Sequence, residues 1–131
     1  MGNKMDKILA EISAGELIDK ITILEIKKEK ITNKDKIENV SRELISLNES
    51  LKKYIPDVNK ILTLKNELKK INLKLWEIED GKRAAEKNKK FDEKFIELAR
   101  NVYKFNDERA KIKLAINNAL GSNIKEVKSY E

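Results

Sequence analysis

The sequence of 131 residues contains no cysteine and no histidine, one proline, four glycines and few aromatic residues. Without cysteine there is no disulfide and no thiol nucleophile, and without histidine there is no imidazole acid–base catalysis. Zinc sites of the usual Cys/His type are excluded as well. Any catalysis would depend on carboxylates, lysines, tyrosines or arginines, and a metal would have to be a hard cation with oxygen ligands. We expect no cofactor and no bound metal.

No long hydrophobic run is present either. The first seven residues are followed only by a short apolar patch, which is too short for the core of a signal peptide. No later segment approaches the length of a membrane span. We therefore expect a cytoplasmic protein without a membrane-spanning segment.

Charge dominates the composition. Charged residues make up 40% of the chain and aromatic residues 5%, and the formal net charge is +6. A chain of this length suits one domain with a modest core, so we expect a single helical domain over residues 1–131. Because only Pro56 interrupts the periodic segments, we expect long helices with heavily solvated faces.

The segment from Ser13 to Ile31 is the only one that is apolar on nearly all sides. Ser13 and Glu16 have the spacing of a capping box, which begins a helix. The main apolar stripe of this helix consists of Ala14, Leu17, Ile21, Leu24 and Ile31. Ile23 and Ile26 form a second stripe on the opposite side. A helix with two apolar sides needs neighbours on both, so we expect it to be the interior helix.

Hydrophobic periodicity predicts three further helices. The first runs from about Lys34 to Tyr54, and the second runs from about Asp57 to Glu79 and stops at Asp80-Gly81. The third begins after the N-cap Asp92 and ends at Gly121. Because a short turn joins the first two, we expect them to form a long antiparallel hairpin at the centre of an all-α, antiparallel four-helix bundle.

Three other segments are less regular. Lys82 to Lys90 is basic and lacks large apolar residues, so we interpret it as a solvated mobile loop, with phosphate binding as the less favoured alternative. Lys7 to Ile12 is short and rich in isoleucine, and Asn123 to Tyr130 alternates in polarity, so each is compatible with a short strand. Since both lie at the same end of an up-and-down bundle, a small two-stranded ribbon formed by the termini is left open.

The least expected residue is Arg109, which projects onto the apolar stripe of the last helix. At about 1.5 Å per residue, it lies opposite the start of the helix at Ser13. Backbone amides, a glycine and cationic side chains meet there, and together they suit an anion. The candidate anion-binding residues are Ser13, Gly15, Asn106, Arg109 and Lys113. The alternative, which we favour, is a simple ion pair between Arg109 and Glu16.

A second cluster contains carboxylates near the end of the predicted helix from Asp57 to Glu79. Glu77 and Asp80, at i and i+3, can share one face, as a magnesium-binding helix requires. A catalytic site of that kind also needs an acidic pair on a neighbouring helix, and only Glu25 and Glu29 are available, with a different spacing. We therefore favour carboxylates that solvate a helix end, and we assign no catalytic residue.

Four runs of sequence resemble a family of small uncharacterised bacterial helical proteins, a domain of unknown function. They are GELIDKITILEIK at Gly15 to Lys27, LWEIED at Leu75 to Asp80, FIELARNVYKFNDERAKIKLAIN at Phe95 to Asn117 and EVKSY at Glu126 to Tyr130. The resemblance covers nearly the whole chain from Lys7 onward. Such proteins look like companions of glycosyltransferases and surface-polysaccharide genes, which implies a pathway and no particular activity.

These observations favour a non-catalytic cytoplasmic accessory or binding module in surface-polysaccharide assembly, with a protein partner or a small anionic ligand. They leave open whether the protein is an enzyme, and the first alternative is a small enzyme acting on a phosphorylated or nucleotide-linked substrate. The second is a non-specific nucleic-acid binder, which is less favoured because its lysines do not share one face and no aromatic residue is interleaved. Those lysines are Lys60, Lys65, Lys69, Lys70 and Lys74. Homo-oligomerisation is compatible with the large apolar surface.

Overall fold

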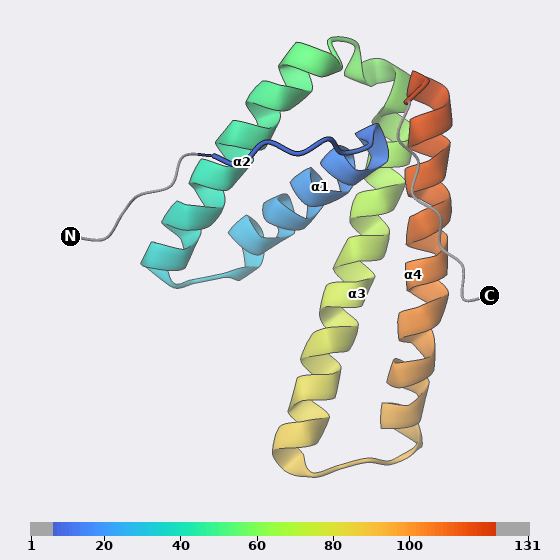
Figure 1. Ribbon diagram of the computed structural model, residues 1–131. Helices are drawn as coiled ribbons and strands as arrows, with labels where there is room; N and C mark the ends of the chain where they lie inside the picture. Colours follow the sequence, from blue (N-terminus) through green and yellow to red (C-terminus); the bar gives the residue numbers. More distant parts are fainter. Residues whose placement is uncertain (1–6, 123–131) are drawn as a thin grey trace.

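The computed structural model describes residues 7–122 (Figure 1). The described chain forms the helices α1 (Ala14–Lys30), α2 (Lys34–Tyr54), α3 (Leu62–Asn88) and α4 (Glu93–Leu120), with a 3-10 turn, η1 (Val58–Ile61), before α3. The helices pack against one another, and the described residues contain no strand. The predicted all-α four-helix architecture is confirmed.

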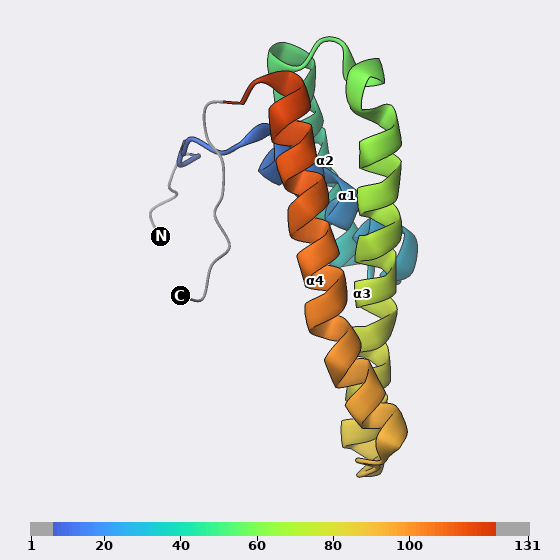
Figure 2. The ribbon, with the colours of Figure 1, turned by 90° about the vertical axis from the view of Figure 1, so that its right-hand side faces the viewer.

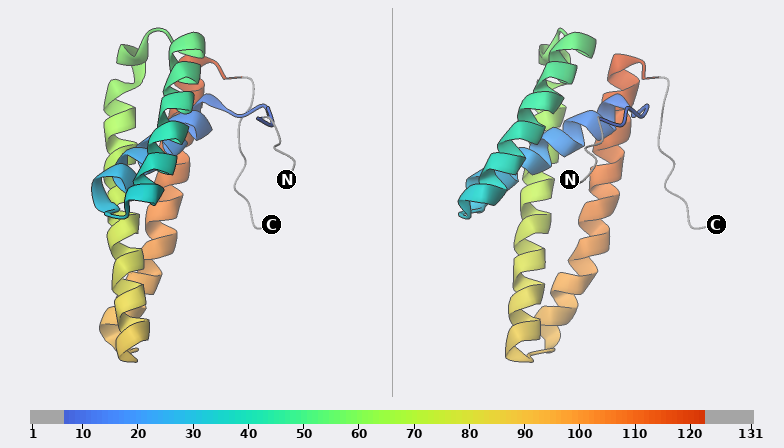
Figure 3. Two further views of the ribbon diagram at one scale, coloured as in Figure 1. Left: turned by 90° about the vertical axis from the view of Figure 1, so that its left-hand side faces the viewer. Right: turned by 60° about the vertical axis from the view of Figure 1, so that its left-hand side comes forward.

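Helix α1 is the interior helix, as predicted. It packs against α2 on one side and against α3 and α4 on the other, and it crosses obliquely between them (Figure 3). Its core side chains are Leu17, Ile18, Ile21 and Leu24, which cluster with Leu44 and Leu51 of α2, Leu68 of α3 and Ile116 of α4. Burial of these aliphatic side chains is the main driving force that holds the four helices together.

The predicted pairing of α2 with α3 is wrong. No residue of α2 has its Cα within 8 Å of a Cα in α3, although both helices are described in full. The two helices diverge from the connection at Ile55 to Ile61, and α1 occupies the space between them (Figure 1). Ile55 and Ile61 are themselves buried in the core, so the connection packs inward. The long antiparallel hairpin of the fold is formed by α3 and α4 instead.

The predicted loop from Lys82 to Lys90 is also corrected, because α3 continues through Gly81 to Asn88. A Cβ atom on Gly81 would lie 3.0 Å from Cδ1 of Leu98 on α4. Gly81 therefore permits close packing of two helices, whereas the prediction took it as a helix stop. The helix ends at Lys89, whose backbone adopts the left-handed conformation.

Several local signals are confirmed. The side chain of Ser13 caps α1, and that of Asp92 caps α4 by accepting from the backbone N–H of Phe95 at 3.2 Å. Helix α4 ends at Gly121, which has φ +63°. Residues 7–12 are irregular, so the first strand of the terminal ribbon is absent, and its predicted partner, Asn123 to Tyr130, lies outside the described residues.

Candidate binding groove beside a buried ion-pair cluster

The less favoured interpretation of the start of α1 was an anion site built on its backbone amides, and these amides already have acceptors within the protein. The hydroxyl of Ser13 accepts from Glu16 N at 3.1 Å, and that of Ser122 accepts from Ala14 N at 3.3 Å. The side-chain carbonyl of Asn117 accepts from Gly15 N at 2.6 Å. An anion at this helix end would have to replace these hydrogen bonds.

Gly15 also has a structural role. A Cβ atom at this position would clash with the backbone carbonyl oxygen of Lys113 and would lie 3.0 Å from Oδ1 of Asn117. The glycine therefore lets the start of α1 press against the backbone of α4. The close approach that the sequence suggested for a ligand is made by a neighbouring helix.

The cationic side chains of the predicted site bind carboxylates of α1. Arg109 donates from Nε to Oδ1 of Asp19 at 2.9 Å and from Nη2 to Oδ2, so the contact is two-pronged. Lys113 donates to Glu16 at 2.6 Å and lies 3.9 Å from Asp19. The favoured partner of Arg109 was Glu16, and the structure gives it Asp19 instead.

Asp19 is the centre of this cluster. Its side chain is 1% exposed, and its Oδ1 also accepts from Nδ2 of Asn72 on α3 at 2.9 Å. The same amide nitrogen donates to the hydroxyl of Thr22 at 2.9 Å. Since the buried carboxylate is met by a guanidinium and an amide, its desolvation is compensated within the protein. Three helices are thereby joined at one side chain.

Sequence reasoning missed Asp19, although a signal was present. Asp19, Ile23 and Ile26 follow one another at helical spacing, so Asp19 lies on the second apolar stripe of α1. If neighbouring helices cover both apolar stripes of α1, the carboxylate of Asp19 must be buried. A buried carboxylate needs a cationic partner to compensate for its desolvation. Arg109, the one cation on the apolar stripe of α4, was the matching residue.

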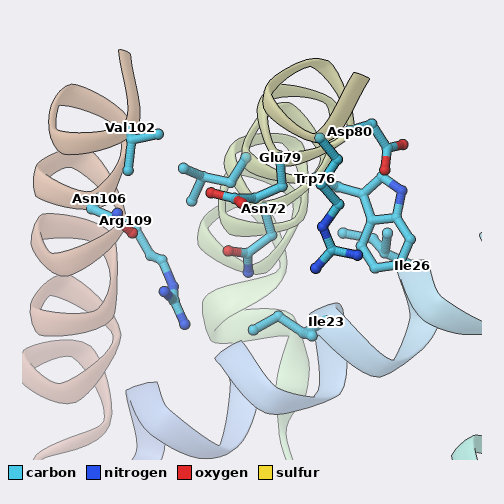
Figure 4. A pocket seen from close by; sticks show the side chains of 11 residues that line it. Ile23, Ile26, Asn72, Trp76, Glu79, Asp80, Val102, Asn106 and Arg109 are labelled. Carbon is cyan, nitrogen blue, oxygen red and sulfur yellow. The ribbon is translucent and has the colours of Figure 1, made fainter. Parts of the chain in front are cut away.

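Next to the cluster, a groove of about 360 Å³ lies between α1, α3 and α4 (Figure 4). Its apolar walls are formed by Ile23, Ile26, Leu75, Trp76 and Val102, and its polar lining by Asn72, Glu79, Asp80, Arg83, Asn106 and Arg109. The indole of Trp76 lies near Ile26 and Asp80, while Asn106 and Arg109 come from α4 on the other side. Of the five predicted site residues, Asn106 and Arg109 line this groove.

Much of the polar lining makes no hydrogen bond within residues 7–122. This holds for the side chains of Trp76, Asp80, Arg83 and Asn106, whereas Glu79 pairs with Lys82 at 3.4 Å. No side-chain polar atom is both buried and unsatisfied in the described chain, so Oδ1 of Asn72, which accepts no hydrogen bond there, is open to solvent. The groove therefore offers donors and acceptors side by side.

The carboxylates Glu25 and Glu29 do not form a second acidic pair for a metal. Glu25 lies 3.8 Å from Lys65, and Glu29 lies 3.1 Å from Lys69, so both are paired with cations of α3. Among the described residues, no group of three or more acidic side chains is arranged to hold a metal ion. The same contacts engage two of the lysines considered for nucleic-acid binding.

None of the helices in residues 7–122 combines the length and the hydrophobicity that crossing a bilayer requires. No curated protein and no solved structure matches the chain. A family model described as a family of unknown function, DUF6165, matches residues 8–131, and the chain therefore belongs to that family.

Proposed function

We propose that the protein is a non-catalytic binding module that holds a hydroxyl-rich ring, such as a saccharide unit, in the groove between α1, α3 and α4. The observation that carries this proposal is the position of Trp76 in the groove wall, beside polar groups that are not used inside the described protein. The groove volume of about 360 Å³ lies within the usual range of small-molecule sites.

The apolar part of the groove matches one side of a sugar ring. A pyranose presents C–H bonds on its faces and hydroxyl groups around its rim. The indole of Trp76 offers a flat apolar surface, Ile23 of α1 extends it, and the buried Ile26 lies behind it (Figure 4). A ring with mixed character can therefore bury a face here and keep its rim against polar side chains.

The polar part favours hydroxyl groups over phosphate. A hydroxyl both donates and accepts, and the groove supplies acceptors from Asp80 and Asn72 and donors from Arg83 and Trp76. A phosphate is negatively charged and presents mostly acceptors, and the carboxylate of Asp80, which has no cationic partner within residues 7–122, would repel it. The guanidinium of Arg109 at the groove edge is already bound to Asp19, so it adds little excess positive charge. We therefore propose a neutral ligand for the groove, in place of the small anionic ligand that the sequence favours.

The arrangement of the carboxylates supports binding without hydrolysis. Glycoside hydrolysis generally uses two carboxyl groups that flank the scissile bond. Glu79 and Asp80 are instead successive residues of α3 and come from the same wall of the groove. Together with the lack of histidine and cysteine, this supports a role in holding a ligand. The proposal extends to a cytoplasmic accessory role in bacterial surface-polysaccharide assembly, which the sequence resemblance implies.

The single tryptophan provides the test, because Trp76 fluorescence reports directly on the groove. Monosaccharides and short oligosaccharides should change the emission of the parent protein and raise its Tm, whereas inorganic phosphate should do neither. By calorimetry, Asp80→Asn and Asn106→Ala should weaken binding, and Asp35→Asn on the exposed start of α2 should not. No turnover of sugar nucleotides with magnesium is expected.

Two results would contradict the proposal. One is a parent protein whose Trp76 emission and Tm do not change with any of the saccharides but do change with phosphate or nucleotides. The other is saccharide binding that Asp80→Asn and Asp35→Asn leave equally unchanged, because the binding site would then lie elsewhere.

A further inference from the structure

The hairpin of α3 and α4 extends beyond the ends of α1 and α2, as two views at right angles show (Figures 1 and 2). Its far end is formed by residues 82–94, which we name the arm tip. The last two turns of α3, the connection from Lys89 to Asp92 and the first residues of α4 make up this segment. Within residues 7–122, the arm tip therefore lies away from α1 and α2 and can be approached from outside.

The arm tip has an excess of positive charge. It contains six basic and three acidic residues. Glu86 lies 3.8 Å from Lys89, and the carboxylate of Asp92 accepts from the backbone N–H of Phe95. Lys87, Lys90 and Lys94 are exposed and have no acidic partner within 4 Å among residues 7–122. Positive charge is thus presented to solvent.

An aromatic side chain lies among these lysines. Phe91 is 52% exposed, although it contacts the ring of Phe95 edge-on at 5.3 Å between centroids. Ile96, on the next turn, is 47% exposed. In the sequence, Lys89 and Lys90 precede Phe91, while Asp92, Glu93 and Lys94 follow it, so the charge around this side chain is positive on balance. An exposed large apolar side chain within a segment of net positive charge is a combination that inserts into the headgroup region of a bilayer.

We infer that the arm tip is a docking surface for an anionic membrane, with Phe91 at the level of the headgroups and Lys87, Lys90 and Lys94 against lipid phosphates. The complementary charge argues for this partner, because each lysine near an anionic bilayer contributes roughly five-fold in affinity. A nucleic-acid surface fits less well, since it would need several aromatic platforms along a basic groove. Of the arm-tip residues, Arg83 lines the groove, but Lys87, Lys90, Phe91 and Lys94 do not, so the docking can be tested without changing the saccharide site.

The experiment measures binding of the full chain to vesicles by co-sedimentation. Vesicles of phosphatidylcholine with phosphatidylglycerol should bind the protein at low salt, and pure phosphatidylcholine should not. Replacing Lys87, Lys90 and Lys94 together by Gln should weaken binding about a hundred-fold. The matched control replaces Lys30, Lys34 and Lys36 by Gln, which removes the same charge from exposed positions near the α1–α2 turn and should weaken binding much less.

A second pair of variants tests insertion at constant charge. Phe91→Ser should reduce binding, Phe91→Leu should retain it, and Tyr54→Ser, at a side chain 70% exposed on α2, should have no effect. Circular dichroism confirms that each variant is folded. The inference is overturned if the tip and control triple variants lose binding equally, because net charge alone would then explain it. It is also overturned if anionic vesicles fail to bind the parent, or if duplex DNA binds at the arm tip in preference to them.

Discussion

Arg109 of α4 donates two hydrogen bonds to the carboxylate of Asp19 of α1, and this ion pair joins α1 to the α3–α4 hairpin. Asp19 is 1% exposed and Arg109 is 29% exposed, so the pair lies at the boundary between the core and the groove. Asn72 of α3 binds the same carboxylate at 2.9 Å. The orientation of α1 against the α3–α4 hairpin therefore depends on one buried charge that several donors satisfy.

Replacing Arg109 by Met should destabilise the protein by roughly 3 kcal/mol, because a buried carboxylate would lose its main counter-charge. Lys113 cannot fully substitute, since its ammonium lies 3.9 Å from Asp19 and binds Glu16 more closely. Urea denaturation of the parent and the variant gives the difference in the free energy of unfolding.

A double variant separates the charge from the shape of the side chain. Asp19→Asn in the Arg109→Met background removes both charges, so most of the lost stability should return. If Arg109→Met alone is as stable as the parent, the pair contributes no stability, and its role as the link between α1 and α4 is wrong.

Two glycines should respond in opposite ways to the same substitution. Gly15→Ala should cost about 2 kcal/mol, because its Cβ would meet the backbone carbonyl of Lys113, which cannot move without separating α1 from α4. Gly81→Ala should be neutral or stabilising by up to about 1 kcal/mol, since helix propensity improves and only the flexible end of Leu98 must shift. Thermal and urea unfolding of the two variants side by side provide the comparison. Equal destabilisation by both would show that α3 and α4 are packed as rigidly at Leu98 as α1 and α4 are at Lys113.

The sequence predicted those features of the fold that depend on neighbouring residues. The caps at Ser13 and Asp92 and the stop at Gly121 are local patterns, and all three are found. The pairing of helices depends on distant contacts, and similar apolar stripes on α2 and α4 did not reveal which one faces α3. Gly81 was ambiguous in the same way, because a stop and a close approach use the same residue, and only Leu98 on another helix distinguishes them.

For the candidate site, the sequence identified Arg109 as unusual and placed it near the start of α1. It could not assign the partner, because a shift of one helical turn along α1 exchanges Glu16 for Asp19. The groove was not predicted, since Trp76 and Asn106 lie on opposite walls that only the packing of α3 against α4 brings to one groove. Both errors therefore arise from tertiary packing.

Asn117 should be important for stability despite being an ordinary polar residue. Its side-chain carbonyl accepts from Gly15 N at 2.6 Å, and the residue is 2% exposed. Asn117→Ala would leave the buried amide of Gly15 without an acceptor, at a cost of about 1–3 kcal/mol. The neighbouring Asn118 is exposed, so Asn118→Ala should change stability by less than about 0.5 kcal/mol. Amide hydrogen exchange at Gly15 should accelerate only in the Asn117 variant, and slow exchange there would contradict the assigned hydrogen bond.

The ion pairs between α1 and α3 should contribute far less than the Arg109 pair. Lys69 lies 3.1 Å from Glu29 and 3.9 Å from Glu25, but its side chain is 34% exposed and that of Glu29 is 59% exposed. Lys69→Met should therefore cost less than about 1 kcal/mol, and added salt should reduce even this difference by screening. The Arg109→Met difference should persist in high salt, because Asp19 is shielded from solvent. Urea titrations of both variants at low and high ionic strength measure the two losses in the free energy of unfolding. If the Lys69→Met loss equalled the Arg109→Met loss at both ionic strengths, burial would not determine how much these ion pairs contribute to stability.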